Sequence, residues 1–569
     1  EARVAGGAAE VDQAALGQWK HGFINVNDVL DTVLPAQTIG SSFQVKFGQQ
    51  GNTSINVPNP ELDQDDGYTF DDVSLAEALN DVAITQVVSP AVSGCNMSGT
   101  QAVSVRIKNY SATGFSNVPV SYRVNGGAVV NETISTINPN STQVFTFATP
   151  VTLAQNTDYT FDIWVKAPAD SYTTNDSIIS YSFHTSPLIT SYPYLEGFEG
   201  SDGNWYAKGS NSTWQWGTPA KAIINKAANG TKAWVTSLTG NYSNNELSYL
   251  YSPCFDLHTL AQPVLSFSHI FSIEDGCPCD YNWVEYSNDG GITWNKLGTN
   301  GTGVNWYNDP TGLNQWRTSL NKWHVASINI PTTGTNVRFR IVMSSDAGFN
   351  TEGVAVDDIH VFDKAAVYTG GQLLNTTQTV SGSNWVYFNS GGNRIAGLNA
   401  NGQNLGVTTV DVYPYVGAVR NSNNQYYLNR NIVVHPGNAP VGPVSVRFFF
   451  TDAEAKSLIA ATGCTPCSKP GDPYELGVTK YSGPPAQENG TLADNMPGGL
   501  YSFILPSNTD IIPYDNGYYA EFSVNSFSEF WLSNGGLNNN QPLPLNLVSF
   551  EAVKKDKQAL LQWATENEI

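Results

Sequence analysis

Asp and Glu are the most numerous residues in this sequence that could act in catalysis or bind a metal: it contains 49 of them, compared with seven His and six Cys. Two carboxylates on either side of a sugar linkage can hydrolyse it, and the sequence leaves open a pair that folding brings together. Asp357 and Asp358 are adjacent, and neighbouring strand residues point to opposite faces, so both can enter one cleft only at a bulge. No metalloprotease, serine hydrolase or nucleotide-binding motif occurs. We therefore assign no catalytic residue.

The segment 285–294, EYSNDGGITW, fits the pattern S-x-D-x-G-x-T-W at every specified position. It resembles the Asp-box, a hairpin motif known best from sialidases. We expect Asp289 to accept backbone N–H bonds across the turn, and Gly290 and Gly291 to supply positive φ angles. Thr293 and Trp294 should begin the next strand, with the indole buried against the sheet. A sialidase propeller would repeat the motif, so a single full match indicates a well-made hairpin and leaves the enzyme interpretation second.

The cysteines form two close pairs, Cys277 with Cys279 and Cys464 with Cys467, and two isolated positions, Cys95 and Cys254. A structural zinc site usually needs two such pairs in one small domain, whereas these pairs lie far apart with no His nearby. Over a zinc site we favour a disulfide between Cys464 and Cys467 and a bridge from the 277/279 pair to Cys254. Disulfides suit an extracellular protein.

Composition restricts the partners and the compartment. The net charge of −22 at pH 7 argues against nucleic acids and anionic membranes as partners. No run of 18 apolar residues occurs, so we predict no membrane span. The first ten residues lack the basic and apolar regions of a signal peptide. We expect that a signal peptide has been removed, or that the chain begins inside a longer protein.

Two stretches share one design, which indicates an internal repeat. Residues 43–73 and 337–363 each contain an alternating strand, an acidic loop with Gly, and a last strand in which Asp-Asp precedes Val or Ile. A segment with Trp19 or Trp323 comes before each stretch. The first copy shows only its C-terminal third. We therefore expect residues 1–79 to be the C-terminal part of a domain.

The second copy, residues 187–364, is long enough to be complete. It contains, in order, SYPYLEGFEG, LYSPCFDL, PVLSFSHIFS, DYNWVEYSNDGGITW and the Asp-Asp strand. These elements resemble the MAM-like or "cleaved adhesin" jelly rolls attached to secreted bacterial proteases and adhesins. The resemblance implies a jelly roll at 187–364 and part of one at 1–79.

The other regions also show short alternating strands, so the predicted fold class is all-β, a multidomain string of jelly-roll and immunoglobulin-like β-sandwiches. Residues 80–186 have the strand pattern of an immunoglobulin-like sandwich. Residues 365–541 should form a β-rich domain with one short helix, capped by Thr451 and Glu454 and stopped at Gly463. They resemble a domain common near the C-termini of large Bacteroidetes surface proteins.

Residues 542–569 resemble the first two strands of the small immunoglobulin-like module that precedes the sorting signal of the type IX secretion system. We expect this module to be truncated. The resemblances imply a non-catalytic adhesin or structural protein, exported by type IX machinery to the cell surface or released. Its partners would be surface glycans, proteins or further copies of itself. The alternative is the accessory, substrate- or carbohydrate-binding tail of a secreted protease or glycosidase, whose catalytic domain would precede residue 1.

Two further expectations follow from the resemblances. Jelly rolls of these families often hold calcium where the first and last strands meet, which implies Glu199, Asp357 and Asp358 as ligands, and Asp71 and Asp72 in the first copy. Secreted Bacteroidetes proteins can carry O-glycans on Ser or Thr between Asp and an apolar residue. This pattern makes Thr32 and Ser177 candidate glycosylation sites.

Overall fold

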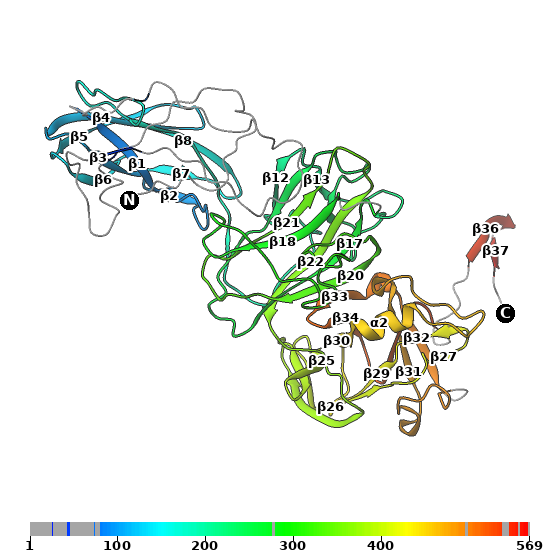
Figure 1. Ribbon diagram of the computed structural model, residues 1–569. Helices are drawn as coiled ribbons and strands as arrows, with labels where there is room; N and C mark the ends of the chain where they lie inside the picture. The colour runs from blue at the N-terminus through cyan, green and yellow to red at the C-terminus, as the bar shows by residue number, and fades with distance from the viewer. Residues whose placement is uncertain are drawn as a thin grey trace. The chain divides into compact units, whose positions relative to one another are not determined.

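The computed structural model describes residues 80–275, 279–495, 499–536, 546–555 and 558–566, together with Val26, residues 43–45 and Val73. The chain divides into two compact units, residues 1–77 and 78–569. The jelly-roll part expected at 1–79 lies outside the described residues, apart from those isolated positions. In the second unit strands make up nearly all of the regular structure, so the predicted all-β class is confirmed (Figure 1).

Residues 80–186, here called the spacer, fold into two sheets around one core. The first sheet contains, in spatial order, β1 (Val82–Ser89), β3 (Ser104–Asn109) and β6 (Thr142–Thr146). The second contains β5 (Val130–Ile137), β4 (Phe115–Val124), β8 (Asp158–Val165) and β9 (Ser177–His184), while β2 (Gly99–Gln101) pairs with β7 (Val151–Leu153). Val105 and Ile107 share a buried cluster with Phe161 and Ile163, as the alternation of their strands requires.

Residues 187–364, here called the jelly roll, form two larger sheets. The first contains, in spatial order, β13 (Trp214–Gly217), β14 (Ala233–Thr236), β22 (Gly353–Asp363), β17 (Pro263–Ser272) and β20 (Leu320–Asn329), and β11 (Tyr194–Glu196) also pairs with β22. The second contains β12 (Tyr206–Ser210), β15 (Leu247–Tyr251), β21 (Arg338–Ser344), β18 (Tyr281–Ser287) and β19 (Asn295–Lys296). β10 (Leu188–Ile189) and β16 (Cys254–Phe255) form a parallel pair. An aromatic core that includes Trp205, Trp306 and Trp316 holds the sandwich together.

Residues 365–536, here called the third domain, contain two more sheets. One has the order β23 (Leu373–Ser381), β26 (Asn404–Pro414), β29 (Arg430–His435), β35 (Glu529–Ser533), β31 (Gly477–Ser482) and β32 (Leu500–Ile504). The other has the order β24 (Val386–Ser390), β25 (Asn393–Asn399), β30 (Val444–Thr451), β34 (Gly517–Val524) and β33 (Asp510–Tyr514). Short elements complete it: the pair β27 (Asn421–Ser422) and β28 (Gln425–Tyr426), and the 3-10 turns η2 (Pro473–Glu475), η3 (Pro485–Gln487) and η4 (Pro506–Asn508).

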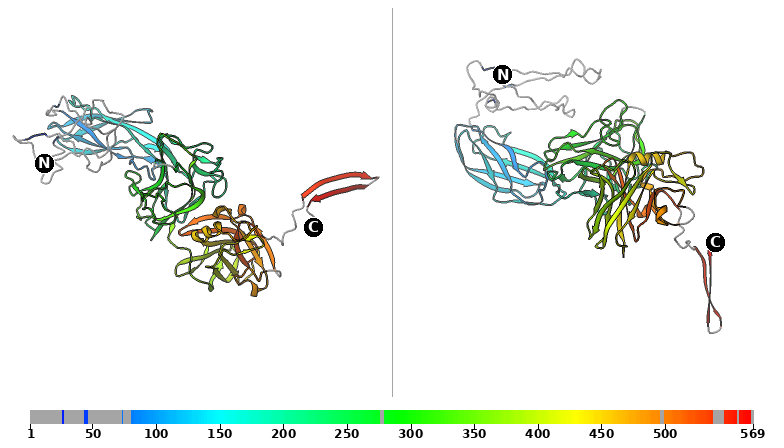
Figure 2. Two further views of the ribbon diagram at one scale, coloured as in Figure 1. Left: turned by 45° about the vertical axis from the view of Figure 1, so that its right-hand side comes forward. Right: turned by 90° about the horizontal axis from the view of Figure 1, so that it is seen from below.

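The helix predicted in the third domain is present as α2 (Asp452–Ile459). Thr451 and Glu454 form the expected capping box, in which each side chain bonds the backbone N–H of the other residue. The helix ends at Ile459 with Ala460 as its C-cap, so the predicted stop at Gly463 lies beyond the observed end of the helix. Beyond the third domain, β36 (Asn546–Lys555) and β37 (Gln558–Glu566) form an antiparallel hairpin, drawn in red in Figure 2. Among the described residues, no helix has both the length and the apolar character that a bilayer crossing requires.

The jelly roll and the third domain share one apolar core, here called the seam. Ile270, Trp323 and Val325 of the jelly roll belong to the same buried cluster as Leu458 and Tyr518 of the third domain. The Tyr518 hydroxyl also accepts a bond from the Val325 N–H at 2.9 Å. Every residue of β17 is buried, because one of its faces lies in the jelly-roll core and the other in the seam.

Candidate functional site

The outward face of the second jelly-roll sheet carries a row of aromatic and charged side chains, here called the ladder. Backbone pairing places one residue of each strand in register across the sheet: Tyr206, Tyr251, Arg340, Glu285 and Lys296. These side chains share a face because the residues between them, such as Leu250, Ile341 and Val284, are buried in the core.

Arg340 is the centre of the ladder. Its Nε donates to Glu285 Oε2 at 2.6 Å, and one of its terminal nitrogens donates to the Tyr251 hydroxyl at 3.1 Å. Its guanidinium carbon lies 4.2 Å from the ring centroid of Tyr249 and 4.3 Å from that of Trp294. The Arg340 and Glu285 side chains are only 15% and 13% exposed, so packing fixes this ion pair in one geometry.

Aromatic rings continue the ladder on both sides of Arg340. Tyr206 and Tyr251 stack with ring centroids 5.1 Å apart. Trp283 donates its indole N–H to Glu285 Oε1 at 2.7 Å, and Lys296 Nζ lies 4.4 Å from the Trp283 ring centroid. Such a face can hold a ligand by ring stacking and by hydrogen bonds to charged groups.

The spacer contacts the end of the ladder at β12, and this contact is here called the joint. The His184 ring stacks on Tyr206 with centroids 3.5 Å apart. Asp158 Oδ1 accepts a hydrogen bond from His184 Nδ1 at 2.9 Å. The same oxygen forms an ion pair with Lys208. Burial is the largest influence on His184 and lowers its pKa, although the Asp158 carboxylate opposes this change. The spacer therefore supplies side chains directly to the edge of the ladder.

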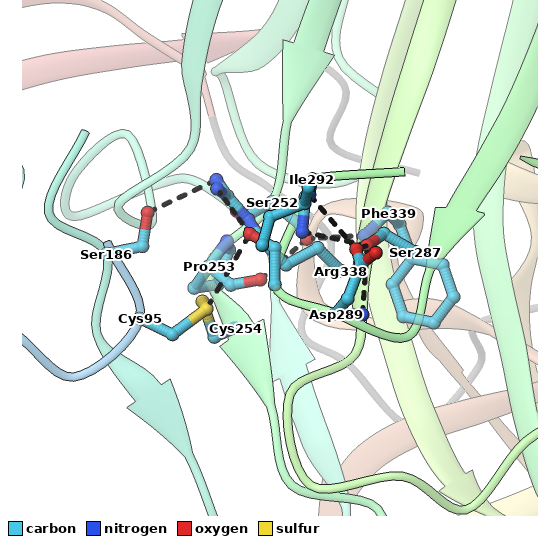
Figure 3. The surroundings of a disulfide bond; sticks show 12 residues. Cys95, Ser186, Ser252, Pro253, Cys254, Ser287, Asp289, Ile292, Arg338 and Phe339 are labelled. Atoms are coloured by element: carbon cyan, nitrogen blue, oxygen red, sulfur yellow. Dashed lines mark hydrogen bonds between the residues drawn. A yellow bond between two sulfur atoms is a disulfide. The ribbon is translucent and has the colours of Figure 1, made fainter. Parts of the chain in front are cut away.

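A disulfide between Cys95 of the spacer and Cys254 of the jelly roll closes the joint (Figure 3). This pairing corrects the sequence prediction, which linked Cys254 to the 277/279 pair. Cys254 begins β16, which pairs with β10, and its N–H donates to Pro187 O, so Cys254 lies where the spacer chain enters the jelly roll. Cys279 is also disulfide-bonded. Cys464 and Cys467 form the disulfide that the sequence predicted.

Arg338 connects the disulfide region to the ladder. Its side chain, buried in the joint, donates to Ser252 O at 2.9 Å and to Ser186 Oγ at 3.2 Å (Figure 3). It also donates to the Tyr206 hydroxyl at 3.0 Å. One partner comes from the end of the spacer and the others from the jelly roll. Arg338 thus bonds both modules at once and fixes the orientation of Tyr206.

The Asp-box segment forms the tight turn that its sequence predicts. Asp289 Oδ1 accepts the N–H groups of Ile292 at 3.0 Å and Thr293 at 2.9 Å, and Gly290 and Gly291 have φ angles of 76° and 101°. Burial opposes ionisation of Asp289, but hydrogen bonds from Ser287, Thr293 and the turn backbone outweigh it and hold its pKa at about 2. The turn is a structural element, and its carboxylate is fully engaged.

Two details of this hairpin differ from the prediction. The next strand, β19, begins at Asn295 and not at Thr293. The Trp294 indole does not enter the core; it lies on the outward face beside Arg340 and Tyr251, and its N–H donates to Gly291 O at 3.0 Å. The hairpin therefore places an aromatic side chain on the ladder.

The adjacent carboxylates Asp357 and Asp358 lie at a bulge, the condition under which both can face one region. The register of β22 against β17 shifts between Ser266 and Ser268, and Asp358 has a φ of 48°. Asp357 Oδ2 accepts the Ala228 N–H at 3.0 Å, and Asp358 Oδ2 accepts the Asn229 side-chain amide at 2.6 Å. Burial raises the pKa of both carboxyls.

The carboxylates implied by resemblance as calcium ligands accept hydrogen bonds from protein donors in this structure. Glu199 accepts bonds from the Thr231 N–H at 2.9 Å and the Lys232 N–H at 2.8 Å, and Asp357 and Asp358 accept donors of their own. Calcium needs six to eight oxygen ligands around one point. Among the described residues, the one group of three His, Cys, Asp or Glu ligand atoms within 4.8 Å of one another is Glu274, Cys279 and Asp346, and Cys279 is disulfide-bonded.

Of the remaining predicted site residues, only Ser177 lies within the described part of the chain. Asp71 and Asp72 lie outside the described residues, so the calcium prediction in the first copy concerns positions that the structure does not describe. Thr32 also lies outside them. Ser177 is half-buried at the start of β9, next to the buried Asp176. Calcium binding and O-glycosylation stay predictions, and intact-mass measurement of native material tests the second.

No family model matches the chain. Among curated proteins, Bacillopeptidase F of Bacillus subtilis (strain 168) is 29% identical over 187 residues, which are 33% of this chain and 12% of that protein. The chain thus spans about an eighth of the length of the curated relative that it matches.

Several solved structures are similar to parts of the chain. The K1 cleaved adhesin domain of Lys-gingipain from Porphyromonas gingivalis W83 is 14% identical, with 31% of this chain and 100% of that chain covered and a TM-score of 0.20. The carbohydrate-binding module TmCBM61, solved with β-1,4-galactotriose, is 16% identical, with 31% and 100% covered and a TM-score of 0.21. SGBP-B from a xyloglucan utilization locus in Bacteroides uniformis is 14% identical, with 50% and 74% covered and a TM-score of 0.20.

Proposed function

We propose that this chain is the non-catalytic binding part of an exported protein, and that the ladder is its ligand-contact surface. The observation that carries this proposal is the alignment of Tyr206, Tyr251, Arg340, Glu285 and Lys296 in one row, with Trp283 and Trp294 beside them. Aromatic rings fixed by ion pairs and by neighbouring rings lose little conformational freedom when a ligand binds.

A carbohydrate fits this surface best. Sugar rings present apolar C–H faces that stack on Trp and Tyr, and hydroxyls that pair with Arg, Glu and Lys. The ladder runs across all five strands of its sheet, so an extended glycan suits it better than a small molecule. Cell-surface proteins and further copies of this chain remain alternative partners.

Export is supported by the disulfides Cys95–Cys254 and Cys464–Cys467, which persist in oxidising compartments. As a finer part of the proposal, the type IX secretion system carries the protein to a Bacteroidetes cell surface, where it acts as an adhesin or is released. The support for this part is the resemblance of residues 542–569 to the module before a type IX sorting signal. Secretion in a type IX mutant strain tests it directly.

A glycan array probed with the full chain tests the binding proposal. We expect retained glycans, and loss of retention in the variants Trp283→Ala and Trp294→Ala. Tyr415→Ala is the matched control, because Tyr415 is 49% exposed on the third domain, away from the ladder. An array on which no glycan is retained, or on which the ladder variants and the control behave alike, would contradict the proposal.

One observation favours a second candidate function, the accessory tail of a secreted hydrolase. A third of this chain is 29% identical to a small part of Bacillopeptidase F, a peptidase by name. In this alternative the ladder would hold the substrate of a catalytic domain that precedes residue 1. The complete open reading frame decides between the two, because a peptidase or glycosidase domain upstream supports the tail and its absence supports the adhesin.

A further inference from the structure

The spacer contains a second group of acidic and amide side chains, remote from the ladder. Asp81 immediately precedes β1, and Asp170, Asn175 and Asp176 lie on the loop between β8 and β9. The Asn175 side-chain amide donates to Asp81 Oδ1 at 2.9 Å, and the Ile84 N–H donates to Asn175 O at 3.1 Å. These bonds fold the loop over the start of the domain and bring the four side chains together.

Three oxygen atoms of this group are buried without a donor. Asp81 Oδ2, Asn175 Oδ1 and Asp176 Oδ1 have no hydrogen-bond partner among the described residues. Asp81 is 0% exposed and Asp176 is 9% exposed, so water has little access to either carboxyl. A buried acceptor left unpaired costs about 1–3 kcal/mol, and native proteins rarely leave several together.

Two other carboxylates of the same domain have hydrogen-bond donors for their oxygens. Asp170 accepts the Val82 N–H at 2.9 Å with one oxygen and the Tyr172 N–H at 2.8 Å with the other. Asp162 is equally buried, but it pairs with Arg123 at 2.7 Å and accepts the Ser180 N–H at 3.0 Å. Asp81 and Asp176 differ from these two residues because each keeps one buried carboxylate oxygen without a hydrogen-bond donor.

Negative charge accumulates at this point. Burial, and then the neighbouring carboxylates Asp170 and Asp81, raise the pKa of Asp176 to about 7, and burial also raises the pKa of Asp81. A cation would remove this repulsion and supply the missing partner of all three oxygens. Carboxylate and amide oxygens, without a sulfur or imidazole ligand, select a hard cation such as calcium.

We propose that Asp81, Asn175 and Asp176 bind a calcium ion, and that Asp170 holds the loop in place and adds negative charge beside the ion. The site is distinct from the calcium that resemblance implies in the jelly roll, and it does not depend on the glycan proposal. Bound calcium would fasten the loop after β8 to the start of β1, where the chain enters the spacer. Because the site exists only in the folded spacer, binding stabilises that domain by mass action.

Local hydrogen–deuterium exchange of the full chain tests this proposal. Exchange is measured at about 1 mM calcium, the range in which extracellular modules bind this ion, and again with a chelator. We expect peptides covering residues 80–84 and 170–178 to exchange at least about tenfold more slowly with calcium, which corresponds to about 1.4 kcal/mol of local stabilisation. The local readout separates this site from any calcium bound by the jelly roll.

Three variants make the test specific. Asp176→Asn and Asn175→Ala should each abolish the calcium-dependent protection, and the second retains both carboxylates in case the first does not fold. Asp162→Asn is the matched control: it should speed exchange because its Arg123 pair is lost, but it should keep the calcium difference. Equal exchange with calcium and with chelator in the unchanged chain would overturn the proposal. So would a difference that survives in both site variants, or protection that follows pH alone, which would indicate a proton shared by Asp81 and Asp176.

Discussion

The jelly roll is attached at its two sides by contacts of opposite character. At the joint, a disulfide and polar groups such as Arg338 connect it to the spacer. At the seam, a continuous apolar core connects it to the third domain, and buried carboxyls and imidazoles lie in or beside that core. Neighbouring β modules of one chain therefore differ in how independently they can unfold. The joint should respond to reductant, whereas the seam should respond to core truncation and pH.

The largest expected effect is the loss of a large side chain in the seam. Trp323 is 2% exposed and donates its indole N–H to Lys226 O at 3.2 Å. Trp323→Ala should lower the free energy of unfolding by about 3–5 kcal/mol, because it leaves a cavity in a core that two modules share. Calorimetry should show both modules unfolding at a lower temperature in one transition. Two separate transitions, of which only one has a lower melting temperature, would disprove the shared core. Tyr415→Ala, at an exposed position of the third domain, is the control and should leave the melting temperature unchanged.

The second effect is the loss of the disulfide at the joint. Cys95 and Cys254 are 159 residues apart in sequence, so their bond closes a long loop in the unfolded chain. The double variant Cys95→Ser with Cys254→Ser should lose about 2–4 kcal/mol in denaturant unfolding. The matched control is Cys464→Ser with Cys467→Ser, whose bond spans a separation of 3 residues and should contribute less. An equal or larger loss in the control would contradict the assignment of the joint.

The third effect is a pH dependence of the seam. The folded-state pKa values of Asp357 and Asp358 are raised above the unfolded value of 3.8 by burial. Their contribution to stability is therefore complete below about pH 4 and is lost as the pH rises through the folded-state values. Asp358→Asn should make the melting temperature fall less between pH 5 and pH 8 than it does in the unchanged chain. Asp363→Asn, an exposed carboxylate on the same strand, should leave that fall unchanged.

Two buried histidines should make the folded protein less stable at acid pH, whereas Asp357 and Asp358 make it less stable as the pH rises. Burial lowers the pKa of His324 and of His360 to about 4, below the value of 6.5 that an exposed imidazole has. Both must therefore stay neutral in the folded protein, and stability is lost as the pH falls from 6.5 toward 4. His360→Gln should reduce the acid-induced loss, because an amide keeps a donor near Pro513 O, which the His360 ring contacts at 3.0 Å. An unchanged acid midpoint would show that this imidazole does not limit stability.

The smallest effect is expected in the Asp-box turn. Asp289 has a folded-state pKa of about 2, lower than 3.8, so its contribution is complete above pH 4 and is lost as the pH falls toward 2. Asp289→Asn should cost about 1 kcal/mol at neutral pH through weaker bonds to the turn N–H groups. The change should leave the seam transition in place. A cost near that of Trp323→Ala would mean that the turn does more than close a hairpin.

The sequence predicted local features better than contacts between modules. The capping box at Thr451 and the positive φ angles at Gly290 and Gly291 depend on a few neighbouring residues, and the structure has both. The Cys254 pairing and the shared core at Trp323 depend on which modules meet, which alternation within single strands does not encode. Apolar residues occur at both odd and even positions of β17, and this pattern indicates a strand that is buried on both faces.

The ladder was missed although its signal is present in the sequence. Runs such as YLY at 249–251, RFR at 338–340 and WVE at 283–285 place aromatic or charged residues on the outward phase of each strand. Each run predicts an outward face, but the register that aligns Tyr251, Arg340 and Glu285 arises only when the three strands pair. The hydrogen bonds of the predicted calcium ligands could not be read from the sequence either. Glu199 accepts from the Thr231 N–H and Asp357 from the Ala228 N–H, and both donors are distant from their acceptors in sequence.

The most direct test of the central claim, that the ladder is a binding surface, is hydrogen–deuterium exchange of the full chain with and without a saturating glycan selected on the array. We predict slower exchange in peptides covering 206–210, 247–251, 281–296 and 338–344, the strands of the ladder sheet, and no such change in the Trp283→Ala chain. Protection confined to the third domain or the spacer, with the ladder strands unchanged, would contradict it.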